Sequence, residues 1–101
     1  MEILLDGNKI IDKNSLFISL KEQINSEEFH GNNLDALWDV LSCNNNNLVV
    51  TITNKDKLEA NLGEYLTILL DLFNELISPD REVTINLIWY FSFQYIQLTK
   101  E

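Results

Sequence analysis

The sequence is short of basic residues and of cysteine, and both shortages exclude whole classes of protein. Seven Lys and Arg residues stand against 16 Asp and Glu residues, which gives a net charge of −9. This balance argues against nucleic acid or an anionic membrane as a direct partner, because both would be repelled, and it favours a basic partner. A single cysteine, Cys43, allows no intramolecular disulfide and no zinc cluster. We also expect no metal and no cofactor.

Long apolar runs are also missing. No stretch of about 20 apolar residues occurs, so we expect no membrane-spanning segment. The first residues, MEILLDGNK, lack the basic region and the apolar run of a signal peptide, which makes the cytoplasm the expected location. A chain of 101 residues with 46% hydrophobic content is expected to fold as one domain, residues 1–101, around one core.

Hydrophobic patterning predicts three strands connected by helices. Short apolar or β-branched runs predict strands at Glu2–Asp6, Leu48–Thr53 and Val83–Phe91. The nearly continuous apolar character of Leu48–Thr53 is typical of a strand covered on both faces or nearly so. Strands separated by helical connections favour parallel pairing with right-handed crossovers, which is an α/β domain.

Helical spacing of apolar residues predicts two helices outside the central segment. One covers Ser15–Ile24 with Asn14 as its N-cap, and the other is a long amphipathic helix over Leu62–Ile77. The segment Lys55–Asn61 fits either a short polar helix or an irregular link. The inward residues of the long helix are expected to be Leu62, Leu66, Leu69, Leu70, Phe73 and Leu76.

The most informative segment is Phe29–Ser42, which reads FHGNNLDALWDVLS. Asn33 is a plausible N-cap for a helix that follows it. At 100° per residue the leucines of this helix share one apolar stripe, and an adjacent face carries Asp35, Trp38, Asp39 and Ser42.

Asp35 and Asp39 form an i, i+4 pair of like charges, which costs a helix about 0.2–0.5 kcal/mol. No Lys or Arg occurs from Glu22 to Asn54, so nothing nearby in sequence relieves the pair. An unneutralised acidic face beside a large aromatic side chain predicts a binding site for a cationic partner.

The run N-L-D-A-L-W-D within Gly31–Leu41 resembles the barstar family of ribonuclease inhibitors. The resemblance extends over roughly residues 1–88, from the first strand and its Asp-Gly turn to the final T-I-N-L strand. It implies a barstar-like two-layer fold, in which helices pack on one face of a three-stranded parallel sheet. It also implies an intracellular inhibitor of a small, basic, barnase-like ribonuclease that is secreted.

In that family the motif helix and the loop after it plug the active site of the ribonuclease. By matching position, Asp39 would be the central carboxylate where the substrate phosphate sits. Asp35 would pair with a second basic group, and Asn33 and Trp38 would flank the two carboxylates. The other contacts that the resemblance implies are Phe29, Ser42, Cys43, Asn44, Asn46 and, from the later helix, Glu75.

Departures from the family pattern leave other functions open. The loop after Ser42 lacks the glycine, aromatic and acid of the founding member, so the chain could be an immunity or antitoxin-type module for a different basic nuclease or toxin. An enzyme could use Asp35 and Asp39 as an acid–base pair or as Mg²⁺ ligands. The absence of a Gly-rich phosphate loop disfavours that alternative, and we expect no enzyme activity.

The aromatic tail, residues 89–101, has no counterpart in the founding member. Its β-prone composition fits an extension of the last strand or packing over the sheet, and an exposed edge of this kind would promote dimer formation. We expect a monomer, with a dimer through the tail as the alternative.

Overall fold

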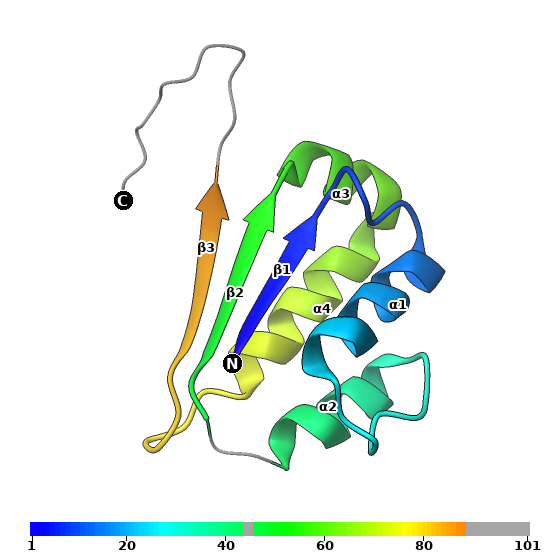
Figure 1. Cartoon of the computed structure of the whole chain (residues 1–101). Helices are drawn as coiled ribbons and strands as arrows, with labels where there is room; N and C mark the ends of the chain where they lie inside the picture. Colours follow the sequence, from blue (N-terminus) through cyan, green and yellow to red (C-terminus); the bar gives the residue numbers. More distant parts are fainter. Residues whose placement is uncertain (44–45, 89–101) are drawn as a thin grey trace.

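The computed structural model describes residues 1–43 and 46–88 as two layers, a parallel sheet and a layer of helices (Figure 1). The three strands are paired in the order β1-β2-β3, and both pairs are parallel. This confirms the predicted fold class. The strands are β1 (Glu2–Asp6), β2 (Leu48–Thr53) and β3 (Val83–Ile88), and the helices are α1 (Lys13–Ile24), α2 (Leu34–Ser42), α3 (Lys55–Leu62) and α4 (Glu64–Glu75).

The helices cover one face of the sheet. Along β2 the side chains of Leu48, Val50 and Ile52 are buried, whereas Val49 and Thr51 on the opposite face are half-buried. Alternation of this kind is expected when one face of a strand meets the core. The helices cover one face of β2, and on its other face Val49 and Thr51 are half-buried and Thr53 is buried, so among the described residues the strand is covered on one face and partly covered on the other.

Helix α1 begins earlier than its apolar pattern predicted. Its N-cap is Asp12 rather than Asn14, and it starts at Lys13. The Asp12 carboxylate accepts from the Ser15 amide at 2.8 Å, and the Ser15 hydroxyl accepts from the Asp12 amide at 3.1 Å. This reciprocal capping box satisfies two amides at once, which Asn14 could not do from its position.

The predicted long helix is in fact two helices. Gly63 separates α3 from α4 with φ 58° and ψ −135°, a backbone conformation that glycine adopts at little steric cost. The polar segment that precedes Gly63 is thus a helix, one of its two predicted forms. On α4, Leu72 is buried although it was not predicted to be, and Leu70 is only half-buried.

Some predictions fall outside the described residues. These are the extension of the last strand to Phe91, the roles of the aromatic tail, and the contact at Asn44. In residues 1–43 and 46–88, no helix combines the length and the apolar character that crossing a bilayer requires.

Candidate partner-binding surface

Helix α2 lies beside the end of the sheet at which β1 begins (Figure 1). Its inner face is held in the core by Leu37, Val40 and Leu41, all buried. At its N-terminus the side-chain oxygen of Asn33 accepts from the Ala36 amide at 2.8 Å, which confirms the predicted cap. A helix held by its core face and its cap presents its outer side chains with little conformational freedom.

The two aspartates of α2 both point to solvent. Asp35 and Asp39 are exposed, and within the described part of the chain neither carboxylate forms an ion pair or a hydrogen bond. An ion pair is present on α3, where Lys55 and Glu59 lie 3.2 Å apart. The expectation that these charges are not neutralised within the described residues therefore holds in three dimensions.

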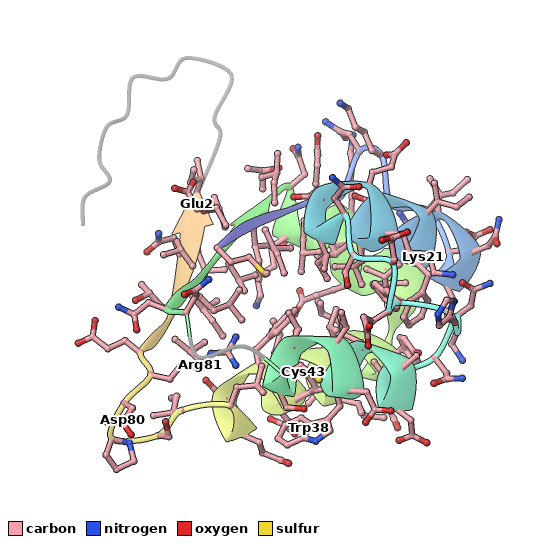
Figure 2. All side chains as sticks on the ribbon, turned by 60° about the horizontal axis from the view of Figure 1, so that its bottom comes forward. Glu2, Lys21, Trp38, Cys43, Asp80 and Arg81 are labelled. Atoms are coloured by element: carbon pink, nitrogen blue, oxygen red, sulfur yellow. The ribbon has the colours of Figure 1, made fainter. Side chains whose placement is uncertain are left out.

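Trp38 is half-buried and lines a groove of about 390 Å³ between α2 and α4. In Figure 2 its ring lies on the side of α2 that meets α4. The groove has an apolar part and three carboxylates. Its lining residues are Leu34, Asp35, Trp38, Ile68, Asp71, Leu72 and Glu75.

Glu75, which the resemblance to the barstar family implied as a partner contact, lines this groove together with Asp35 and Trp38. The groove also includes Asp71, which we did not predict as a site residue. The sequence does contain a signal for Asp71, because Asp71 and Glu75 form a second i, i+4 acidic pair on a helix and no Lys or Arg occurs between Lys57 and Arg81. Sequence spacing alone could not show that this pair faces α2.

The predicted contacts at the end of α2 lie on the surface. Ser42 is exposed, and its hydroxyl donates to the backbone carbonyl of Asp39 at 3.3 Å. Cys43, the C-cap, is an exposed free thiol, and Asn46 is exposed.

Phe29 is different, because its side chain is only 6% exposed. It packs edge-to-face against Phe17, with ring centroids 6.4 Å apart. Phe29 therefore belongs to the core that supports the entry to α2. Its implied contact with a partner stays a prediction, and in the free protein its side chain has a supporting place in the core.

The carboxylates of the groove are not arranged as a metal site. Among residues 1–43 and 46–88, no group of three or more His, Cys, Asp or Glu side chains is placed to hold a metal ion. Spaced carboxylates beside an aromatic ring suit the larger cations of Lys or Arg side chains, which bind to both kinds of group.

The protein has a two-layer α/β fold, and one of its helices presents acidic side chains and an indole ring. These features define a class of small acidic proteins suited to binding a basic macromolecule. The family model described as Barstar (barnase inhibitor) matches residues 1–89. The chain therefore belongs to the barstar family, whose members are ribonuclease inhibitors rather than enzymes. A search of curated proteins gives no match.

Proposed function

We propose that this protein is a cytoplasmic inhibitor that places α2 in the active site of a small, basic, barnase-like ribonuclease. The observation that carries the proposal is the state of Asp35 and Asp39, two exposed carboxylates on a fixed helix with no partner among the described residues. Membership of the barstar family supports the class of target.

Phosphate mimicry explains why such a helix would inhibit. A ribonuclease must bind the phosphate of RNA and therefore concentrates positive charge in its active site. A carboxylate fixed on a helix can occupy that place with little loss of conformational entropy on binding. In this proposal Asp39 replaces the phosphate and Asp35 pairs with a second basic group, through charge-assisted hydrogen bonds.

The groove between α2 and α4 would extend the contact to a further basic side chain of the ribonuclease. The apolar stem of a Lys or Arg can pack on Ile68 and Leu72, while its charge lies near Trp38 and the carboxylates. The net charge of −9 would also accelerate encounter with a basic enzyme.

Titration of ribonuclease activity tests the proposal. Barnase and barnase-like ribonucleases from the same source organism are mixed with the protein, and the remaining hydrolysis of RNA is measured. We expect inhibition by the wild type, and a loss of affinity of roughly tenfold or more for Asp39→Asn, because hydrogen bonds to charged groups are worth about 1.5–3 kcal/mol.

The matched control is Asp56→Asn, which removes one negative charge from α3, on a different part of the surface. It is expected to leave inhibition within about twofold, since exposed charges act weakly at a distance in physiological salt. Equal losses for Asp39→Asn and Asp56→Asn would show that only net charge matters. Failure of the wild type to inhibit any of these enzymes would refute the proposal.

A further inference from the structure

Arg81 is the charged side chain that the structure buries, with 4% of its surface exposed among the described residues. It lies in the loop between α4 and β3. A buried guanidinium is costly unless hydrogen bonds compensate for the water it loses, and this desolvation lowers the pKa of Arg81. Such a residue is expected to have a specific task in the fold.

The guanidinium acts on the C-terminal end of α2. Its Nη1 donates to the carbonyl oxygen of Leu41 at 2.6 Å, across 40 residues of sequence. Figure 2 shows the Arg81 side chain directed toward the end of α2 at which Cys43 lies. The last carbonyls of a helix have no partner within the helix, and they carry a partial negative charge that a cation stabilises.

Helix α2 cannot supply this cation from its own sequence. Its last turn contains no basic residue, and the sequence has none from Glu22 to Asn54. Arg81, from a distant loop, therefore provides the positive charge that α1 has in its own last turn as Lys21.

The loop that carries Arg81 is itself fixed by backbone hydrogen bonds. The amides of Ser78 and Arg81 each donate to the carbonyl of the other, both at 3.1 Å. The next residue, Glu82, donates its amide to the side chain of Asn47 at 2.9 Å and accepts from the Leu48 amide at 2.9 Å. The guanidinium thus links α2 to the start of β2 and β3.

We propose that Arg81 is a positioning residue that holds the C-terminal half of α2, and with it Asp39, in the geometry that binds the partner. Asn33 holds the other end of the helix through its cap. The consequence for binding rests on the proposed function, whereas the anchoring of α2 does not.

Hydrogen exchange on the free protein tests the anchor. Arg81→Met keeps the length and packing of the side chain but removes its donors, and Arg81→Lys keeps the charge with a single donor group. We expect amides of residues 39–43 to exchange at least about tenfold faster in Arg81→Met than in wild type, because local opening of that end becomes easier. Arg81→Lys should restore part of the protection.

The control is Leu58→Ala, a cavity variant in α3 that lowers global stability and leaves the sequence of α2 and its bond to Arg81 in place. If Arg81→Met and Leu58→Ala, compared at equal global stability, show the same exchange at residues 39–43, Arg81 is only a general stabilising residue and the proposal is overturned.

Double-mutant cycles with barnase as the probe test the consequence for binding. Arg81→Met should lower the affinity for barnase about tenfold. Its effect on the binding free energy should be coupled to that of Asp39→Asn and additive with that of Asp35→Asn, because coupling is expected between neighbouring groups only. If the effect of Arg81→Met on binding is additive with that of Asp39→Asn as well as with that of Asp35→Asn, Arg81 does not position Asp39 and the proposal is refuted. If wild type does not bind barnase, the proposed function fails for this enzyme, and the exchange experiment still decides whether Arg81 anchors α2.

Discussion

Asp39→Asn is expected to stabilise the free protein while it weakens the complex. The substitution removes the repulsion between Asp35 and Asp39, worth about 0.2–0.5 kcal/mol. It breaks no hydrogen bond of the described residues, since the Asp39 carboxylate forms none. Asp39 also lies in the second half of α2, where the helix dipole does not favour a carboxylate. We expect the melting temperature to rise by about 1–4 °C.

Asp35→Asn provides an internal comparison. Asp35 lies in the first turn of α2, where the helix dipole stabilises a carboxylate by about 0.3–1 kcal/mol. Its replacement relieves the same repulsion but loses this stabilisation, so the net change should be close to zero or slightly unfavourable. The two substitutions remove equal charge from one helix, and their effects on stability should differ in sign or size.

The measurements are urea unfolding followed by circular dichroism, and inhibition titrations on the same samples. In the complex each substitution should cost about 1.5–3 kcal/mol, which is roughly 10- to 150-fold in affinity. If Asp39→Asn lowers the free energy of unfolding by more than about 1 kcal/mol, the carboxylate has an internal partner and our description of α2 is wrong. Unchanged inhibition would show that the partner binds elsewhere.

Three further outcomes follow from the fold and the charge. Gly7→Ala should destabilise the protein by about 3 kcal/mol in urea unfolding, because an added Cβ would lie 2.1 Å from the Asn54 carbonyl oxygen and 2.7 Å from the Leu58 amide nitrogen. The amide of Asn8 and the side chain of Asn54 donate hydrogen bonds to the Asp6 carboxylate and lower its pKa below 3.8. The ionised carboxylate therefore stabilises the folded state above the unfolded-state pKa, and this stabilisation is lost as the pH falls through the folded-state pKa. Asp6→Asn, which can still accept both hydrogen bonds, should reduce the dependence of unfolding free energy on pH below about pH 4; an unchanged dependence would contradict this assignment. Stopped-flow association with a basic ribonuclease should slow as salt rises to 0.15 M, where surface charges are screened over about 8 Å, and a salt-independent rate would exclude steering.

Much of the fold could be predicted because its signals are local. The three strands were identified from short apolar runs, and α2 from its cap at Asn33 and its leucine spacing. The errors occurred where two local signals compete. Asp12 and Asn14 are both good cap residues, and only the reciprocal bonds with Ser15 decide between them. Gly63 fits a helix interior in sequence, but its backbone conformation divides the predicted helix in two.

The edge of β1 illustrates a feature that no local pattern shows. The side chain of Gln23, on α1, accepts from the Leu4 amide at 2.6 Å and donates to the Leu4 carbonyl at 2.8 Å. It thereby occupies groups of an edge strand that would otherwise be open to pairing. In the sequence Gln23 is an ordinary polar helix residue.

The sequence by itself determined the charge of the protein, the pairing of Asp35 with Asp39, and the helix that displays them, because charge, capping and helical spacing depend on residues a few positions apart. The tertiary structure decided which distant groups join that helix. Packing of α4 against α2 places Asp71 and Glu75 in one groove with Trp38, and the loop before β3 brings Arg81 to the end of α2. These contacts depend on how the whole core packs, and no single segment encodes them.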